Sequence, residues 1–337
     1  MARSLPKPVT ITDVAAHAGV SLSTVSRVLN GNLTVDAVLA ERVRASATEL
    51  HYTASPLARS LVLGRTQTIG VVVPDLGNPT FQAILRGLNR AAGRDGYHVL
   101  IADSAEQVDE ERVLSVQSRR RTDGLILCAP RMPQDELDAL LPEVGPVVLV
   151  NRQSTVGVPV VAADYRTALG ELAEHLYQLG HRRLLYLAGV SRSASNAQRL
   201  AAVASFRARH ADVDVIEQPC GVDFDSGAQS VDAVLTSGAT GVLAFNDLVA
   251  MGLMSALEKR GTLVPADISV AWFDDIPFAP YTSPPLTTAS VAAGELGERA
   301  WEAMQALLAG GQAGEAVSLV PRVQVRESTG PARVGRR

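Results

Sequence analysis

The sequence is poor in cysteine and in aromatic residues and has no long apolar run, and each shortage excludes a class of protein. Only Cys128 and Cys220 occur among the 337 residues, and they match neither a zinc-binding pattern nor a redox pair. Aromatic side chains make up 4% of the chain, so we expect cores of Ala, Val and Leu. No window approaches the roughly 18 apolar residues of a membrane-spanning helix, and residues 1–9 lack the apolar centre of a signal peptide. We therefore expect a cytoplasmic protein without disulfides.

Sequence motifs of common enzymes are also lacking. The chain contains no GxxxxGK, GxGxxG, GxSxG or HExxH sequence. Asp274 and Asp275 offer a neighbouring carboxylate pair, but such a pair alone makes a weak case for catalysis. The histidines are dispersed without the spacing of metal ligands, at His17, His51, His98, His175, His181 and His210. We predict a protein that is not an enzyme and holds neither a metal nor a cofactor.

The charge is distributed unevenly along the chain. The whole chain carries a net charge of -4, yet residues 1–65 hold seven basic and four acidic residues, a net charge of +3, which leaves -7 for the remainder. Phosphate backbones attract locally basic surfaces. A small basic head on a larger acidic body is therefore typical of a protein in which only the head contacts a polyanion.

The head begins with two short amphipathic stretches in VTITDVAAHAGVSLSTVSRVLNGN, residues 9–32. Thr12 is predicted to cap the first helix, and Gly19 permits a sharp turn. Ser21 is predicted to cap the second helix. The inward residues are Val14, Ala15, Ala18, Val25, Val28 and Leu29, and the outer face of the second helix carries Leu22, Ser23, Ser26 and Arg27. This pattern predicts a helix-turn-helix whose second helix lies in the DNA major groove, with Arg27 as the main candidate for base contact. The alternative is a pair of ordinary core helices joined by a glycine.

Two further segments complete this region. A third helix is predicted over Asp36–Leu50 with Val38, Leu39, Val43, Ala47 and Leu50 as its apolar residues. Ser55 and Pro56 then start a short helix that ends near Leu63. Because about eight residues do not hold a helix alone in water, we expect this segment to order against its twin in a dimer or against DNA. Leu57 and Leu61 share one face and suit a wedge in the minor groove; the alternative is a linker whose leucines dock on the body.

The body alternates apolar strand-like runs with helical stretches. The predicted strands are 69–74, 98–103, 124–129, 146–151, 184–189, 241–246 and 268–275, and the predicted helices are 81–93, 109–120, 166–179, 197–209, 226–236 and 247–260. This alternation predicts an α/β body of two doubly wound parallel sheets.

Ligands of such sheets bind at the carboxyl ends of the strands. The polar residues there are Asp75, Asn78, Asn151, Arg152, Asn246, Asp247, Asp274 and Asp275. Carboxylates, amides and a guanidinium suit the vicinal hydroxyls of a sugar. The alternative for each is a helix cap or turn residue, and Asp247 is placed to cap the helix that begins there.

With these features in view, the chain resembles the lactose/galactose repressor (LacI/GalR) family of bacterial transcription regulators. The resemblance rests on TITDVAAHAGVSLSTVSRVLNG at 10–31, LHYTASPLARSL at 50–61, TIGVVVPDLGNPTF at 68–81, DGLIL at 123–127, AFNDLVAMG at 244–252 and FDDIPFAPYTSPPLTT at 273–288, in family order. It implies a helix-turn-helix head, a hinge helix and a body like the periplasmic binding proteins.

The resemblance also implies site residues. Expected DNA contacts are Thr10, Ser21, Leu22, Ser23, Thr24, Ser26, Arg27, Asn30, Ser55, Ala58 and Leu61, with Leu61 as the intercalating leucine. Together with the residues after the strands, the expected effector contacts are Asp75, Asn78, Phe81, Asn151, Arg199, Phe224, Asn246 and Asp274.

Three residues depart from the family pattern and limit which residue roles of the family can be assigned to this sequence. Leu39 and Ala40 stand where the family commonly has a threonine and an arginine that grip phosphates, so we expect Ser21, Thr24, Arg42 and Arg44 to carry more of that role. Trp272 stands where the family usually has glycine, and its bulk either narrows the cleft or repacks behind it.

The expected organisation follows. Residues 1–54 form the DNA-binding domain, 55–66 the hinge helix and linker, and 67–330 the effector-binding and dimerisation domain, with a frayed tail at 331–337. Within the body, one subdomain takes 67–163 and 290–320, and the other takes 164–289 and 321–330.

The expected function is that of a transcriptional regulator that associates with the nucleoid. A homodimer would repress carbohydrate uptake or catabolism genes from a palindromic operator on double-stranded DNA, switched by a sugar or sugar phosphate and without membrane contact. No leucine-heptad tail supports a tetramer. The alternatives are a purine or nucleoside corepressor, a cytoplasmic sugar-binding protein, or an enzyme.

Overall fold

A computed structural model of the chain describes residues 9–29, 35–53, 64–311 and 314–333. The chain forms two compact units, Met1–Gln67 and Thr68–Arg337, which we call the head and the body. Within the described residues, no helix has both the length and the apolarity needed to cross a membrane.

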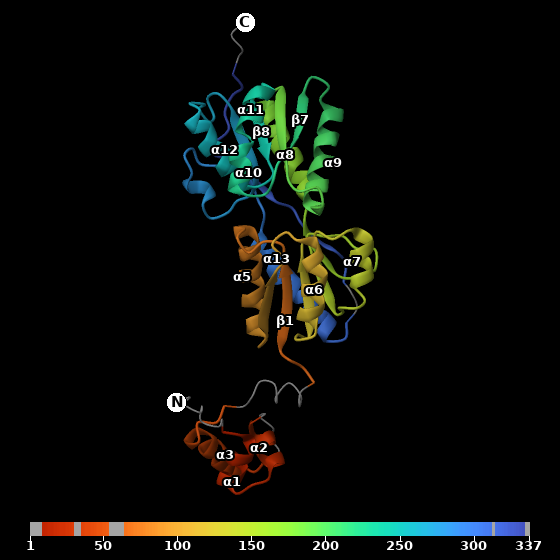
Figure 1. Cartoon of the computed structure of the whole chain (residues 1–337), viewed down its shortest axis with the longest axis vertical. Coiled ribbons are helices and arrows are strands. Elements are labelled where there is room, and N and C mark those ends of the chain that lie inside the picture. Colours follow the sequence, from red (N-terminus) through yellow and green to blue (C-terminus); the bar gives the residue numbers. More distant parts are fainter. Residues whose placement is uncertain (1–8, 30–34, 54–63, 312–313, 334–337) are drawn as a thin grey trace, which may run out of the picture. The chain divides into compact units, whose positions relative to one another are not determined.

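The described residues of the head form three helices: α1 (Ile11–Ala18), α2 (Leu22–Leu29) and α3 (Ala37–Glu49) (Figure 1). Val14, Val25 and Val43, one from each helix, are fully buried and form the centre of a small core. The prediction of a three-helix head is therefore confirmed. Val38, expected inside, is instead 79% exposed, because the buried face of α3 is made by Ala40, Val43, Ser46 and Ala47.

The ends of the head helices are fixed by local hydrogen bonds. Thr10, and not the predicted Thr12, caps α1: its hydroxyl accepts from the Asp13 backbone N–H, and the Asp13 carboxylate accepts from the Thr10 N–H at 2.8 Å. This reciprocal pair satisfies two backbone donors at once. Gly19 ends α1 with φ 64°, a conformation that glycine adopts without strain. Ser21 caps α2 as predicted, its Oγ accepting from the Thr24 N–H at 3.2 Å. The predicted hinge helix lies outside the described residues.

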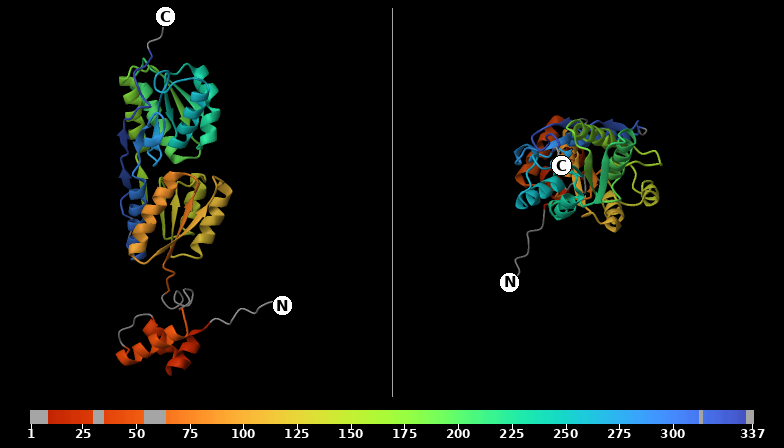
Figure 2. Two further views of the ribbon diagram at one scale, coloured as in Figure 1. Left: turned by 90° about the vertical axis from the view of Figure 1, so that its left-hand side faces the viewer. Right: turned by 90° about the horizontal axis from the view of Figure 1, so that it is seen from above.

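The first sheet of the body has the order β11-β5-β4-β3-β1-β2 and is parallel throughout. Its strands are β1 (Thr68–Val73), β2 (His98–Asp103), β3 (Gly124–Cys128), β4 (Val147–Val150), β5 (Val160–Ala163) and β11 (Val317–Leu319). One face is covered by α5 (Pro79–Arg94) and α13 (Ala293–Leu308), the other by α6 (Val108–Arg119) and α7 (Gln134–Leu140) (Figures 1 and 2).

The second sheet has the order β12-β10-β9-β8-β6-β7. Its strands are β6 (Arg183–Ala188), β7 (Asp214–Pro219), β8 (Gly241–Ala244), β9 (Ser269–Asp274), β10 (Thr287–Ser290) and β12 (Arg322–Gln324). All pairs are parallel except β10 with β12, which is antiparallel. The helices α8 (Tyr165–Gln178) and α9 (Ala194–Arg209) pack on one face, and α10 (Phe224–Gln229), α11 (Val231–Ser237) and α12 (Asp247–Lys259) on the other.

The chain crosses between the two sheets three times, after β5, after β10 and after β11, so each subdomain contains distant parts of the sequence. Two doubly wound sheets were predicted, and the prediction is confirmed. The stretch expected as one helix over 226–236 is two, α10 and α11, which meet at Ser230. Strand β7 was missed because it is a sheet edge in which only Val215 is buried.

Candidate functional site

A small cavity of about 40 Å³ lies at the carboxyl ends of strands from both sheets. Its lining includes six of the eight effector contacts predicted from the sequence, namely Asn78, Phe81, Asn151, Arg199, Asn246 and Asp274. These residues come from both subdomains, so the cavity spans the boundary between them. We refer to it as the cleft cavity.

The other two predicted contacts lie outside the cleft cavity. The Asp75 carboxylate accepts from the Gly77 N–H at 2.7 Å and so closes a local turn after β1. Phe224 is the first residue of α10 and is 49% exposed. Of the two aromatic residues among the predicted effector contacts, Phe81 lines the cavity and Phe224 does not.

Arg199 dominates one wall of the cleft cavity. The residue is 2% exposed, and its guanidinium carbon lies 4.3 Å from the ring centre of Tyr165 and 4.4 Å from those of Phe245 and Phe273. These ring faces stabilise a cation. Among the described residues, nothing accepts a hydrogen bond from its buried Nε or Nη1. A buried donor without a partner is costly, so these two N–H groups favour a site where a ligand supplies the acceptors.

Asp274 supplies the opposite chemistry. Burial raises the pKa of the Asp274 carboxyl, while the positive charge of Arg199 opposes this shift. The second charged pair at the cavity is already satisfied, because the Arg131 guanidinium donates to both oxygens of Glu106 at 2.8 Å. The cavity therefore offers one guanidinium as a donor and one carboxylate as an acceptor, with no net charge when Asp274 is ionised.

Three amides line the cavity wall, and all have structural partners. Asn151 donates from Nδ2 to the Tyr165 hydroxyl at 3.0 Å and accepts from the Ala163 N–H at 2.9 Å. Asn246 caps α12 through the Val249 N–H and donates to the Val222 carbonyl, and Asn78 caps α5 by accepting from the Thr80 N–H at 2.9 Å. The amides therefore shape the wall, whereas the buried Arg199 Nε and Nη1 and the buried Thr80 hydroxyl have no hydrogen-bond partner among the described residues.

Asp247 does not cap α12, contrary to the sequence-based alternative. Its carboxylate accepts from the Ile276 N–H at 2.6 Å and from the Thr288 hydroxyl at 3.0 Å, while Asn246 makes the cap. Burial raises the pKa of Asp247 well above its usual value, and Asp274 adds to the shift. This carboxyl fixes the loop after β9, the strand that carries Asp274.

Several residues of the cavity hold unfavourable backbone conformations. Glu106, Ala129, Asn151 and Asp274 all have φ between 45° and 107° and all line the cavity. Side chains other than glycine rarely adopt such angles, and the strain is retained where surrounding structure imposes it, often at binding sites. The backbone therefore supports the same location as the side chains do.

Sequence reasoning missed several residues that line the cavity. They are Thr80, Glu106, Ala129, Arg131, Tyr165, Ser195, Val222 and Phe245. Glu106 and Arg131 follow β2 and β3 closely, so the rule that selected the other residues also applies to them. Tyr165 had no such signal, because the preceding strand β5 was not predicted. Trp272 points elsewhere: it is fully buried in the core against α11 and α12, so its bulk repacks behind the cleft.

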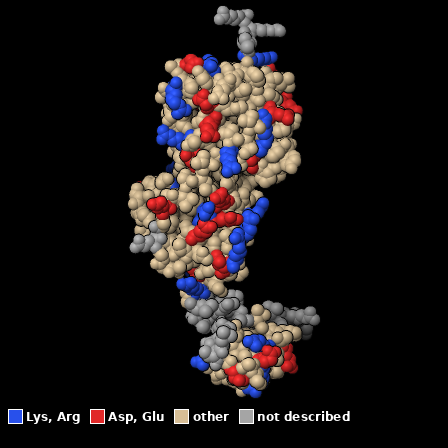
Figure 3. Space-filling model, turned by 180° about the vertical axis from the view of Figure 1, so that it is seen from behind, with Lys and Arg blue, Asp and Glu red and all other residues tan. Residues whose placement is uncertain are grey.

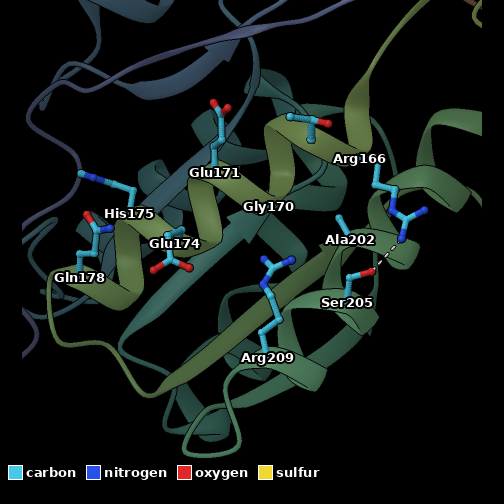
Figure 4. A pocket seen from close by; sticks show the side chains of 10 residues that line it. Arg166, Gly170, Glu171, Glu174, His175, Gln178, Ala202, Ser205 and Arg209 are labelled. Atoms are coloured by element: carbon cyan, nitrogen blue, oxygen red, sulfur yellow. Dashed lines mark hydrogen bonds between the residues drawn. The ribbon is translucent and has the colours of Figure 1, made fainter.

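A larger groove lies elsewhere on the body, between α8 and α9, with a volume of about 550 Å³ (Figure 4). Figure 4 shows Arg166 bonded to Ser205 across it, at 3.0 Å. Glu174 is paired with His210 at 2.9 Å. The groove lies on helix surfaces away from the strand ends, and these charged side chains already have partners, so the smaller cleft cavity remains the better candidate.

The head presents a second candidate surface on α2. Leu22 is 48% exposed, and Ser23 and Arg27 are also exposed, whereas Thr24 and Ser26 are half-buried. The hydroxyls of Thr10 and Ser21 serve as helix caps and still lie at the surface. Ala40, which stands where the family commonly has a residue that grips phosphate, is buried. Arg42 and Arg44, which are expected to carry more of that role, are exposed. The predicted contacts Asn30, Ser55, Ala58 and Leu61 lie outside the described residues.

The body offers no comparable basic surface on the face shown in Figure 3, where acidic and basic side chains are interspersed. On that face, therefore, the basic side chains of the body do not gather into a patch that would offset its net negative charge.

Comparisons with known proteins match both the head and the body. Residues 10–55 match the family described as bacterial regulatory proteins, lacI family, and residues 173–329 match the periplasmic binding protein-like domain. The HTH-type transcriptional repressor CytR of Escherichia coli K12 is 32% identical over 297 residues, covering 86% of this chain and 87% of that protein. The chain belongs to the LacI family. As a member it is a DNA-binding transcriptional regulator, and the fold and family expected from the sequence are confirmed.

Other relatives agree. The ribose operon repressor of E. coli K12 is 33% identical over 301 residues, covering 86% of this chain and 90% of that protein. The crystal structure of the Lac repressor dimer bound to operator and the anti-inducer ONPF matches with a TM-score of 0.88 at 28% identity, covering 96% of this chain and 100% of that one. A LacI family regulator from Enterococcus faecium with bound ribose matches with a TM-score of 0.69 at 27% identity, over 79% of this chain and 100% of that one.

Proposed function

We propose that this LacI-family regulator represses genes of carbohydrate uptake or catabolism, and that a sugar-like effector in the cleft cavity relieves repression. The observation that carries this proposal is the pairing of Arg199, which has two buried N–H donors without an acceptor among the described residues, with Asp274, a half-buried carboxylate. Vicinal hydroxyls accept from a guanidinium and donate to a carboxylate at the same time. The cavity's balanced charge suits a neutral polyol.

The same geometry favours a sugar over a purine or nucleoside. A flat base needs a free aromatic face on which to stack. The faces of Tyr165, Phe245 and Phe273 are occupied by the Arg199 guanidinium, and Phe224 lies outside the cavity. That leaves Phe81 as a single wall. The similar regulator from E. faecium holds ribose, which supports the same class.

The small volume of the cavity suggests how effector binding changes the arrangement of the two subdomains. A volume of about 40 Å³ falls well below the roughly 300 Å³ of ordinary ligand pockets. The two subdomains must therefore separate or rotate to admit a sugar, and the effector favours whichever arrangement fits it best. In a homodimer with paired hinge segments, this change would alter the grip on two half-sites about one helical turn apart.

Partners and location follow from DNA binding. We infer a palindromic operator on double-stranded DNA as the partner, and therefore a cytoplasmic protein at the nucleoid. That the relatives are repressors supports a regulatory role rather than an enzymatic one. Function of this kind needs neither a metal nor a cofactor.

The decisive experiment is selection of genomic fragments by the purified protein at physiological salt, followed by displacement with a panel of sugars and purines. A palindrome beside sugar-uptake or glycosidase genes, released by a sugar, is the expected result. Release by purines alone would replace the sugar with a nucleoside effector, and retention without a shared sequence motif would contradict specific recognition. Leu61→Ala should lower specific operator affinity, since the proposed hinge wedge would be lost.

A further inference from the structure

A second opening lies beside the cleft cavity, and its lining includes three arginines. It has a volume of about 430 Å³ and lies where the chain leaves β3, β4 and β6, so both subdomains contribute to it. Arg131 and Arg152 come from the first subdomain and Arg192 from the second. Arg131 lines both this opening and the cleft cavity, so the two adjoin at that residue. We call the opening the arginine groove.

The arginine groove has an unbalanced charge. Three of its lining residues carry guanidinium groups, and none of them is aspartate or glutamate. Arg131 is neutralised by Glu106, but neither Arg152 nor Arg192 has a carboxylate within ion-pair distance among the described residues. Two positive charges thus lie at a concave surface whose lining holds no carboxylate, while Glu111 and Asp138 act on Arg152 electrostatically from outside that lining. This arrangement differs from the exposed arginines elsewhere on the body, many of which are ion-paired, such as Arg112 and Arg182.

Arg152 is held in place across the boundary between subdomains. Its Nη2 donates to the Met132 carbonyl at 2.9 Å, and its Nη1 lies 3.5 Å from the Arg192 carbonyl in the other subdomain. Its Nε is buried, and no described residue accepts a hydrogen bond from it. Burial lowers the pKa of Arg152, Glu111 and Asp138 oppose this shift, and the positive charge of Arg131 adds to it. The guanidinium is therefore preorganised and only partly satisfied.

The second subdomain adds the start of a long helix. Helix α9 has 16 residues, and its cap Ser193 and first residue Ala194 both line the groove. A helix start alone would not define a site, but here its partial positive charge adds to that of the two arginines. All contributions have the same sign, and they come from both sides of the boundary.

We propose that the arginine groove binds a phosphate group, held between Arg152 of the first subdomain and Arg192 at the start of α9 in the second. Guanidinium groups match the oxygens of phosphate in charge and in geometry. A dianion bound there contacts both subdomains and stabilises their closed arrangement. The phosphate is either a substituent of the effector, which extends past Arg131 from the cleft cavity, or a separate phosphate. The first case rests on the proposed function; the second does not.

The test uses the full-length protein without DNA and probes it with inorganic phosphate, ribose and ribose 5-phosphate at constant ionic strength. Binding is measured by calorimetry and by the shift in Tm. Arg192→Gln is the main variant, because the side chain is exposed and its loss should leave the fold intact. Arg152→Gln is the second variant. The matched control is Arg121→Gln, an equally exposed arginine before β3, at the opposite end of that strand.

Saturable binding of inorganic phosphate or ribose 5-phosphate, weakened about tenfold or more by Arg192→Gln and unchanged by Arg121→Gln, is the expected result, because a charge-assisted hydrogen bond contributes roughly that factor. Failure of both phosphate probes to bind would overturn the proposal. Binding that is equally strong in the wild type and in Arg192→Gln would overturn it too, since the anion would then lie elsewhere.

A further variant, Arg199→Ala, separates this inference from the proposed function. If the anion site is independent, inorganic phosphate binds alone and Arg199→Ala leaves that binding unchanged. If the phosphate belongs to the effector, ribose 5-phosphate binds more tightly than either ribose or inorganic phosphate, and both Arg199→Ala and Arg192→Gln weaken it. Phosphate binding without a DNA-release response to any sugar would contradict the proposed function and still support the arginine groove.

Discussion

The guanidinium carbon of Arg199 lies 4.4 Å from the ring centre of Phe273, the residue that directly precedes Asp274. The end of β9 therefore contacts the Arg199 guanidinium through Phe273 and also carries the Asp274 carboxylate. Phe273 is fully buried, so the position of Asp274 is tied to the packing of Arg199. A ligand that bonds to Arg199 will also act on the end of this strand, where Asp247 fixes the following loop.

Replacing Arg199 with alanine should abolish the response to the effector while effector-free operator binding stays near the wild-type level. The substitution removes two buried N–H donors that have no acceptor among the described residues, and Arg199 belongs to the body rather than to the DNA-binding head. Release of labelled operator DNA during a sugar titration is the measurement. Arg209→Ala on the same helix, at its exposed end, is the control and should respond normally. Loss of operator binding in Arg199→Ala would instead assign Arg199 a purely structural role.

Two arginines of the head should behave differently. Arg27→Ala should lower affinity for the operator by roughly 10- to 100-fold with little change for unrelated DNA, because Arg27 is exposed on α2 and is expected to contact a base. Arg42→Ala, exposed on α3, should weaken binding to every sequence and reduce the dependence on salt concentration, as expected for a phosphate contact. Equal loss on all sequences for both variants would show that Arg27 does not read bases.

The elements predicted best from the sequence were the strands in which nearly every residue is buried. Strands β1, β3, β4, β6, β8 and β9 are buried along nearly their whole length, and each appears in the sequence as a continuous apolar run. The edge strand β7 has neither a continuous apolar run nor an alternation of polar and apolar residues, so it could not be told from a loop. Strands β5 and β11 have four and three residues, too few for a periodic signal.

The candidate site was predictable in its location but less so in its roles. Residues after the strands were expected at one edge, yet the sequence could not show that the Asn246 amide is used to cap α12 while the Arg199 donors stay unpartnered. The rings around Arg199 come from the start of α8, the end of β8 and β9. Such an assembly depends on tertiary packing, which no local pattern encodes.

Gly87→Ala should destabilise the body by about 2–3 kcal/mol or more, since a Cβ there would lie 2.0 Å from the Gly294 carbonyl oxygen on the neighbouring helix α13. Gly93→Ala on the same helix is the matched variant: nothing lies within 4 Å of its Cβ, so alanine should stabilise the helix by about 0.5–1 kcal/mol. Urea unfolding followed by tryptophan fluorescence, which Trp272 and Trp301 of the body both supply, gives both values. Equal effects of the two substitutions would contradict the close approach of α5 and α13.

His181 should make the body less stable in mild acid. Its ring is 1% exposed; since a carbonyl only accepts, Nε2 donates to the Gly330 carbonyl at 3.0 Å, and Nδ1 then accepts from the Thr240 hydroxyl at 2.8 Å. This neutral tautomer joins β6, β8 and the C-terminal segment. Burial lowers the pKa of His181 below 6.5, the Gly330 bond opposes this shift, and the positive charges of His175 and Arg182 add to it.

The sign of the pH effect follows from these bonds. As the pH falls below about 6.5, the unfolded chain takes up the proton before the folded chain does, so the free energy of unfolding is largest above that pH and declines below it. His175, which bonds to Thr329 and whose pKa burial also lowers, contributes in the same direction. In urea unfolding at pH 7.5 and 5.5, His181→Asn should therefore lose part of the difference that the wild type shows, whereas His98→Gln, at an exposed position in β2, should keep it. An undiminished difference in His181→Asn would mean that the acid sensitivity of the body arises from other groups, because the only contribution removed is that of the buried neutral ring.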